Sequence, residues 1–233
     1  MQSGFQLTAL GHAAFLVERS GRRVLIDPWL TNPWAPAAEI DFTSLTALVV
    51  THGHRDHLGE AVEIASTWNK PLVVIDDLHN LLAARGARTT IGLNRGGSIE
   101  IDGVQITFTA AVHSSSFLEG ETLIYAGEPC GVVLRIDGDC LYHAGDTALF
   151  GDMQYIHTLY RPRIALLPVG GTWVMEPEAA ALAARLIKPD IVVPIHYPTV
   201  PDAPDRLQGA LAETGLYPGI RVCGIQPGQT VTV

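Results

Sequence analysis

The chain has 233 residues, and its 24 Asp and Glu outnumber its 15 Lys and Arg to give a formal net charge of −9 at pH 7. Binding to nucleic acid or to an anionic membrane needs clustered basic groups, and the sequence has no Lys/Arg block, so the composition argues against both. With 47% hydrophobic and 17% charged residues, the chain can bury a substantial core.

The predicted elements begin with strands and turns. Alternation of polar and apolar residues predicts strands over residues 5–10 and 13–18, and a third short strand over 23–27 ends at Pro28. From residue 45 onward the pattern changes to strand, turn and helix. Further strands are predicted at 45–50, 72–75, 89–93, 98–101, 104–111, 131–136, 140–142, 164–167, 191–194, 220–223 and 230–233, and helices at 58–68, 78–85, 152–160, 176–187 and 205–214.

This order of elements predicts an α/β fold of two mixed sheets with helices outside them. The sequence shows no linker, low-complexity tract or internal repeat, so we expect one domain over residues 1–233. Two segments leave alternatives open. Residues 29–38 form either a lip over a site or packing at the domain edge, and residues 114–129 form either a mobile lid or an ordinary long loop.

The cysteines and the first residues indicate a compartment. Cys130, Cys140 and Cys223 are odd in number and none forms a C-x-x-C pair, which disfavours a disulfide framework. Residues 1–20 lack a basic segment followed by an apolar one, and no apolar run approaches the ~20 residues that span a bilayer. We therefore expect a cytoplasmic protein with no membrane association.

Four side chains that can bind metal fall close together in one predicted turn: His52, His54, Asp56 and His57. Two neutral imidazoles at i and i+2 suit one divalent ion, and the Asp–His pair directly behind them suits a second ion. Asp56 also occupies the expected N-cap of the following helix. The turn therefore predicts part of a metal site that other segments must complete.

Three further candidates each follow the end of a predicted strand: His113, Asp146 and His196. Loops at strand ends converge at one edge of a sheet, where α/β proteins place their sites, so we expect all of these side chains to meet. His52, His54 and His113 would bind one ion, Asp56, His57 and His196 would bind the second, and Asp146 would bridge both. This set of nitrogen and oxygen ligands suits two Zn²⁺ ions, with Mn²⁺ or Fe²⁺ as alternatives.

The motif His52-x-His54-x-Asp56-His57, followed in order by His113, Gly145-Asp146-Thr147 and His196, resembles that of the metallo-β-lactamase superfamily, and the resemblance runs through nearly the whole chain. Residues 11–16, 25–28, 146–153, 168–171 and 194–197 are similar to a subgroup of uncharacterised bacterial metal-dependent hydrolases near L-ascorbate-6-phosphate lactonase. The resemblance implies a four-layer αββα sandwich with a dinuclear site at one edge of its inner sheets.

A two-metal site of this kind predicts a hydrolase in which a metal-bridging hydroxide attacks a small ester, lactone or phosphodiester. Asp56, Asp146 and His196 are expected to serve catalysis as well as metal binding. A phosphorylated or lactone small molecule is the expected partner, and self-association into a homo-oligomer stays open. Two alternatives are a mononuclear iron-dependent oxygenase of the same fold and a nucleic-acid phosphodiesterase, the latter weakened by the net charge of −9.

Four other residues have both a functional and a structural interpretation. His12 either reaches the pocket or makes a structural hydrogen bond in a turn. Asp27, at a strand end, is predicted to orient a metal-binding imidazole by accepting the second N–H of that ring, and a plain turn cap is the alternative. Gly170 and Gly171 either present backbone N–H groups to an oxyanion or allow tight packing.

Overall fold

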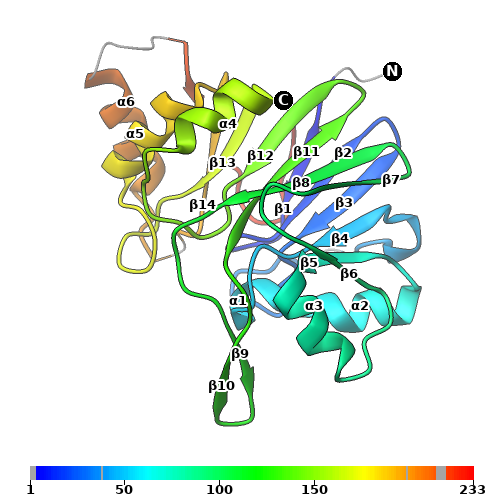
Figure 1. Ribbon diagram of the computed structural model, residues 1–233. Coiled ribbons are helices and arrows are strands. Elements are labelled where there is room, and N and C mark those ends of the chain that lie inside the picture. Colours follow the sequence, from blue (N-terminus) through cyan, green and yellow to red (C-terminus); the bar gives the residue numbers. More distant parts are fainter. Residues whose placement is uncertain (1–3, 38, 198, 214–218) are drawn as a thin grey trace.

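The computed structural model describes residues 4–37, 39–197, 199–213 and 219–233. Over these residues, two seven-stranded sheets lie at the centre of the molecule, and helices lie on the outer sides of the sheets (Figure 1). The predicted α/β fold with an αββα sandwich is confirmed. No helix in the described part of the chain is long and apolar enough to cross a membrane.

The first sheet has the strand order β16-β1-β2-β3-β4-β5-β6. Strands β1 to β3 pair antiparallel, whereas β3 to β6 pair parallel, with helices α1 to α3 in the connections. The strands are β1 (Gln6–Ala9), β2 (Phe15–Arg19), β3 (Arg22–Ile26), β4 (Ala47–Val49), β5 (Leu72–Ile75), β6 (Thr90–Leu93) and β16 (Thr230–Thr232), and the helices are α1 (Arg55–Leu58), α2 (Ala61–Trp68) and α3 (Asp76–Ala83), preceded by a short 3₁₀ helix, η1 (Phe42–Ser44).

The second sheet has the order β15-β14-β13-β12-β11-β8-β7. It is antiparallel from β7 to β12 and parallel from β12 to β15. The strands are β7 (Ser98–Ile101), β8 (Val104–Ala110), β11 (Cys130–Ile136), β12 (Asp139–His143), β13 (Ile164–Pro168), β14 (Ile191–Ile195) and β15 (Arg221–Val222), and the helices are α4 (Met153–Tyr160), α5 (Pro177–Ile187) and α6 (Ala203–Glu213).

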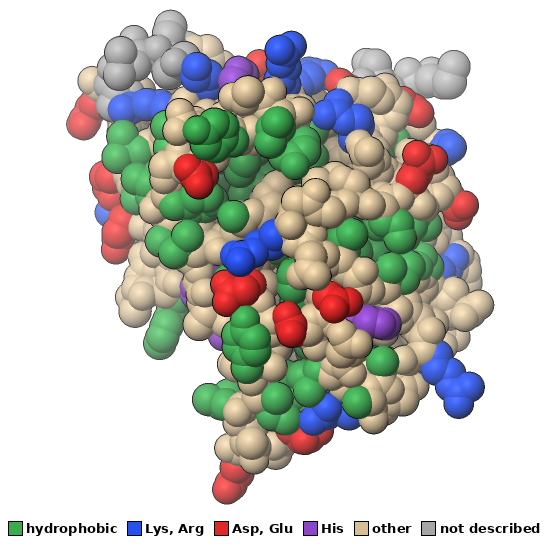
Figure 2. All heavy atoms as spheres, viewed as in Figure 1, with side chains coloured by type: hydrophobic (Ala, Val, Ile, Leu, Met, Phe, Trp, Pro, Cys, Tyr) green, Lys and Arg blue, Asp and Glu red, His purple; other side chains and the backbone are tan. Residues whose placement is uncertain are grey.

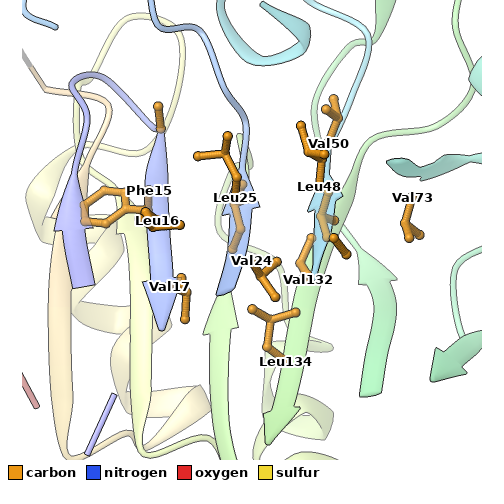
Figure 3. Packing of buried hydrophobic residues seen from close by; sticks show 14 of the residues in the cluster. Phe15, Leu16, Val17, Val24, Leu25, Leu48, Val50, Val73, Val132 and Leu134 are labelled. Carbon is orange, nitrogen blue, oxygen red and sulfur yellow. The ribbon is translucent and has the colours of Figure 1, made fainter. Parts of the chain in front are cut away.

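The core follows from the alternation of side chains along these strands. On β11, Val132 and Leu134 point toward the first sheet, whereas Val133 joins the cluster under the helices α4 to α6. Figure 3 shows Val132 and Leu134 close to Val24 and Leu48 of the first sheet. Because successive side chains of a strand face opposite sides, one strand supplies both the layer between the sheets and the layer under the helices.

Three predictions about local structure were wrong. The helix expected over residues 58–68 is interrupted at Gly59, whose φ of 42° and ψ of −126° end α1 before α2 begins. Asp56 is not an N-cap: His54 holds that position and Asp56 lies in the first turn of α1. The segment 114–129, expected to be a loop or lid, contains a hairpin of β9 (Ser116–Glu119) and β10 (Thr122–Tyr125) that projects from the molecule (Figure 1).

The other expected strands and helices are present with ends shifted by a few residues. Helix α3 begins at Asp76 and α6 at Ala203, both earlier than expected. Residue 214, the predicted end of the last helix, and residue 38, the predicted end of the tryptophan-containing loop, lie outside the described residues. The strands β4, β8, β12 and β14 each end shortly before a candidate metal ligand, as the predicted metal site requires.

Candidate metal centre

The seven predicted ligands lie on segments that follow four strands of the two sheets. His52 and His54 follow β4, and α1 carries Asp56 and His57 directly after them. The remaining three follow β8, β12 and β14: His113, Asp146 and His196. The structure gathers all seven into three overlapping groups in which the ligand atoms lie within 4.8 Å of one another. The predicted convergence of these side chains is therefore observed.

His52, His54 and His113 form the first group. The Nε2 atom of His52 lies 2.9 Å from Nδ1 of His54, and the ring centroid of His113 lies 5.3 Å from that of His52. Two imidazole nitrogens that face each other repel through their lone pairs unless a proton or a cation lies between them. The group therefore has the chemistry of a cation site with three nitrogen ligands.

Asp56, His57 and His196 form the second group, as predicted, but His12 joins them. Oδ2 of Asp56 lies 3.8 Å from Nε2 of His196 and 3.0 Å from Nε2 of His12. The ring of His12 also lies against that of His196, with 3.9 Å between centroids. Of the two interpretations of His12, the structure supports the one in which the side chain reaches the site.

Asp146 lies between the two groups. Its Oδ2 atom is 3.1 Å from Nε2 of His196, 3.3 Å from Nε2 of His57 and 3.6 Å from Nε2 of His113. One carboxylate oxygen thus faces imidazoles of both groups, which is the arrangement expected of a bridging ligand.

Two buried polar atoms of the seven predicted ligands have no hydrogen-bond partner among the described residues. They are Nε2 of His57 and Oδ1 of Asp146. Buried polar atoms are normally paired, so each of these indicates a missing partner. Ligands about 2.0–2.1 Å from a tetrahedral ion lie about 3.3 Å apart, which matches the separations around Asp146. The residues present therefore fit divalent metal ions.

Buried hydrogen bonds behind the ligands set their ring orientation. Nδ1–H of His57 donates to Oδ2 of Asp27 at 2.7 Å, which turns its Nε2 toward Asp146. Asp27 also accepts from the backbone N–H and the hydroxyl of Thr51, both at 2.8 Å. The Thr51 oxygen lies 3.0 Å from Nδ1 of His52 and accepts its proton, which leaves Nε2 of His52 free. The predicted contact between Asp27 and a candidate ligand is observed.

Three residues of the site have a left-handed backbone: His12, Asp27 and His196, with φ of 55°, 48° and 56°. Each of them lies in a connection that follows a strand. A non-glycine residue in the left-handed conformation costs free energy, which the surrounding structure must offset. The backbone N–H of His196 donates to the carbonyl of His12 at 3.1 Å, which ties two of these turns together. The backbone thus directs both imidazoles into the same space.

Burial and neighbouring charges shift the pKa values of the histidines in the site. Burial lowers the pKa of His52 well below its ordinary value, which leaves the imidazole neutral. Burial also lowers the pKa of His57, but Asp146 and Asp27 outweigh it and raise the pKa well above its ordinary value. Burial lowers the pKa of His196 too, yet hydrogen bonds to Asp146 and Asp56 raise it to about 9.

Asp146 is the centre of this charge pattern. Burial acts to raise the pKa of its carboxyl, but His57 and His196 hold that pKa well below the usual range. The buried carboxylate is therefore ionised and needs positive charge beside it. Either imidazolium protons or divalent cations can supply that charge, and metal binding would release the protons.

The glycines after β13 have a packing role. A Cβ on Gly170 would overlap the carbonyl oxygen of His196, so only glycine allows this close approach. The N–H of Gly171 donates to the carbonyl of Met175 at 3.1 Å and is not available to an oxyanion. At Gly170 the structure therefore supports tight packing, and at Gly171 it disfavours the oxyanion interpretation.

Two serines next to His113 were missed because a serine beside a histidine has no distinctive spacing. Oγ of Ser115 accepts the N–H of Gly53 at 3.2 Å and so holds the turn between His52 and His54. Oγ of Ser114 lies 3.5 Å from Nε2 of His54.

The candidate ligands open into a cavity of about 500 Å³, here called the metal cavity. Its wall includes His54, Asp56, His113, Asp146 and His196, together with His12. The rest of the wall comes from residues outside the ligand motif, namely Trp29, Trp34, Ser114, Gly170, Trp173 and Thr199. A small molecule can therefore reach the cluster from outside.

Comparison with known proteins gives consistent matches. The model of the β-lactamase superfamily domain matches residues 22–197. The chain is 40% identical over 97% of its length to a UPF0173 metal-dependent hydrolase of Koribacter versatilis, and 42% identical over 96% to one of Caldivirga maquilingensis, with the same shares of those proteins covered. The solved structure of Igni18, a metallo hydrolase of Ignicoccus hospitalis, superposes with a TM-score of 0.86 at 38% identity and covers 99% of both chains.

Proposed function

The chain belongs to the β-lactamase superfamily and is a metal-dependent hydrolase, and from this premise we propose that its histidine–aspartate cluster holds two divalent ions that cleave a small ester, lactone or phosphodiester. One observation carries the two-metal part of the proposal. Oδ2 of Asp146 lies within 3.6 Å of imidazole nitrogens from both groups of candidate ligands. A carboxylate in that position can hold two cations side by side.

We assign the ligands as the sequence predicts. His52, His54 and His113 hold one ion, Asp56, His57 and His196 hold the other, and Asp146 contacts both. The nitrogen-rich set suits Zn²⁺, with Mn²⁺ or Fe²⁺ as alternatives. Two bound ions of this kind would supply a water of lowered pKa as nucleophile and would polarise the bond to be cleaved.

The protein's own residues prepare the site for that chemistry. Asp27 and Thr51 hold His57 and His52 in the tautomers that expose Nε2 to the cluster. Asp56, Asp146 and His196 line the metal cavity, where they would contact both bound ions and a substrate. The cluster lies at the ends of strands that are otherwise buried, so its geometry is set before a substrate binds.

The surface charge does not favour nucleic acid as a substrate. The net charge is −9, and on the face in Figure 2 basic side chains are interspersed with acidic ones. Nucleic-acid enzymes bind the phosphate backbone through continuous basic surfaces. We therefore place small molecules first among the substrates.

The test begins with metal analysis of protein purified without added metal, followed by hydrolysis assays with Zn²⁺ or Mn²⁺ on carboxylic esters, lactones and phosphodiesters. The expected result is two ions per chain and hydrolysis that an Asp146→Ala variant loses. Asp205→Ala, which removes an exposed carboxylate on α6, is the matched control. Hydrolysis retained by metal-free Asp146→Ala protein would overturn the mechanism, and oxygen uptake by the iron-loaded protein would favour the oxygenase alternative.

A further inference from the structure

A second, smaller cavity lies next to the metal cavity. It has a volume of about 190 Å³ and is called here the side chamber. His12 and Trp34 belong to the walls of both cavities, so the two spaces adjoin at these side chains. A part of the substrate that extends past His12 and Trp34, away from the bond to be cleaved, would enter the side chamber.

The wall of the side chamber is mainly apolar. Besides His12, its members include Phe15, Trp34, Pro194, Tyr197, Ile225 and Pro227. Phe15 and Ile225 are almost fully buried, so the chamber is backed by the core and not by mobile surface side chains. Each apolar group that enters such a space gains free energy by leaving water.

An anionic substituent would find no Lys or Arg counter-charge in the described walls of either cavity. Of the described residues that line the two cavities, none is Lys or Arg. Recognition of a terminal phosphate or carboxylate normally uses Arg, Lys or a helix N-terminus. The metal ions would stabilise negative charge at the bond being cleaved. A second anionic group would lie in the apolar side chamber without a cationic partner.

We propose that the side chamber binds an uncharged apolar substituent, and that the substrate is a neutral carboxylic ester or lactone with such a substituent. This rests on the proposed function and narrows it, because it sets aside phosphorylated substrates. In the reaction the oxygen of water bonds to the acyl carbon and the acyl–oxygen bond breaks. An ester gives a carboxylate, an alcohol and one proton, whereas a lactone gives one hydroxycarboxylate and one proton.

The experiment uses the metal-loaded protein and γ-lactones that share one ring and differ in one substituent: hydrogen, ethyl or butyl, and a chain of equal length that ends in a carboxylate. Acetate esters of methanol, propanol and pentanol form a parallel series. Proton release at constant pH reports every reaction. The expected result is a rise in kcat/KM of about fourfold for each added methylene that enters the chamber, and a lower kcat/KM for the carboxylate chain than for butyl.

A charge variant tests the location. Gln226 lines the side chamber and its side chain is exposed, so Gln226→Lys adds a cation there without disturbing the core. The ratio of kcat/KM for the carboxylate chain to that for butyl should rise several-fold in this variant. Gln154→Lys adds the same charge on an exposed position of α4 and should keep the ratio of the unmodified protein.

The outcomes separate the two proposals. Equal kcat/KM across the neutral series, or an unchanged ratio in Gln226→Lys, overturns the side-chamber proposal and leaves the hydrolase intact. Hydrolysis of phosphodiesters or phosphorylated lactones in preference to all neutral substrates overturns it as well. If the protein loaded with two ions cleaves no ester, lactone or phosphodiester, the proposed function itself fails.

A different observation concerns His12, which lies beside the second group of ligands. Nε2 of His12 donates to Oδ2 of Asp56 at 3.0 Å, whereas its Nδ1 is buried without a hydrogen-bond partner among the described residues. Histidines that bind metal almost always donate their other ring N–H to a partner, as His57 does to Asp27. His12 lacks that partner, so it is better suited to hold a ligand than to be one.

We infer that His12 is a positioning residue that orients Asp56 for the second ion through the Nε2–H bond. Gln can place an N–H donor at about the same reach as Nε2 of His, whereas Asn is shorter but tolerates the left-handed backbone, with φ of 55°, that residue 12 requires. Comparing His12→Gln with His12→Asn therefore separates the effect of losing the hydrogen bond to Asp56 from the effect of straining the backbone at residue 12.

The measurement is Zn²⁺ affinity, by competition with a chromophoric chelator, for each of the two ions. His12→Asn should lower the affinity for one ion about 10- to 100-fold and leave the affinity for the other ion unchanged. His12→Gln should restore most of the lost affinity. Wild-type affinity for both ions in His12→Asn would overturn the inference. An equal loss in both variants would also overturn it, because it would indicate that His12 itself binds metal.

Discussion

Asp27 allows the most direct test of how the fold prepares the proposed metal centre. It is fully buried, and its two oxygens accept three hydrogen bonds. Oδ1 accepts the N–H of Thr51, and Oδ2 accepts the Thr51 hydroxyl and Nδ1–H of His57. Asp27→Asn keeps the shape of the side chain, and Asn tolerates the left-handed backbone with φ of 48°.

The substitution acts on the proton of His57. The Thr51 N–H is a donor and needs an acceptor, so the amide oxygen of the introduced Asn takes the position of Oδ1. The NH₂ group then takes the position of Oδ2. Facing a donor, Nδ1 of His57 must become an acceptor, and the ring proton moves to Nε2, the atom that faces Asp146 at 3.3 Å. An Nε2–H cannot bind metal. We expect the affinity for the second ion to fall about 10- to 100-fold, or about 1.4–2.7 kcal/mol.

The assay is a Zn²⁺ titration against a competing chelator, with thermal unfolding to show that the variant is folded. Asp137→Asn is the matched control, because Asp137 also has a left-handed backbone, with φ of 50°, but is exposed in the turn between β11 and β12. The control should bind both ions as the unmodified protein does. A folded Asp27→Asn protein with unchanged affinity for both ions would refute the reasoning.

Other predictions test the metals, the thiols and the packing. Zn²⁺ at a free concentration of 100 Kd should stabilise the fold by about 2.7 kcal/mol per site. A chelator that removes both proposed ions should therefore lower the melting temperature by about 11–22 °C, and no change would contradict a structural contribution from metal. A thiol reagent should label half-buried Cys223 in the native protein but Cys130 and Cys140 only after unfolding, since burial raises the pKa of both thiols, that of Cys140 to about 11. Gly131→Ala places a Cβ 2.7 Å from the Tyr142 ring. It should lower the free energy of unfolding by about 1–3 kcal/mol and the melting temperature by roughly 2–12 °C. An unchanged melting temperature would show that the ring moves to make room.

The strands and the ligand convergence could be predicted because both follow from local pattern. Short apolar runs identify β11 and β13 directly, and ligands placed after strand ends must meet if the strands share an edge. The break at Gly59 could not be predicted in this way. A Cβ there would overlap the backbone of Pro28 and Trp29, so a distant loop and not the local sequence requires the left-handed turn.

The role of His12 was also beyond the sequence, for a related reason. Its contact with Asp56 joins residues 44 positions apart and depends on a left-handed backbone at both His12 and His196. The hydrogen bond between these two turns, from the N–H of His196 to the carbonyl of His12, forms only when β1 and β14 of different sheets are packed together. Neither residue spacing nor residue type encodes that contact.

The distribution of residues around the cavities separates metal binding from substrate choice. The candidate ligands follow buried strands, and their neighbours leave little room for change, as Gly170 against His196 shows. The walls that would select the substrate come instead from connecting segments, with Trp34 after β3, Trp173 after β13 and Ile225 after β15. Trp173 is 74% exposed, so its replacement removes an apolar surface at the cavity mouth with little cost to the core. Substitutions in these segments should therefore change which substrate is bound and leave the affinity of the proposed centre for metal unchanged.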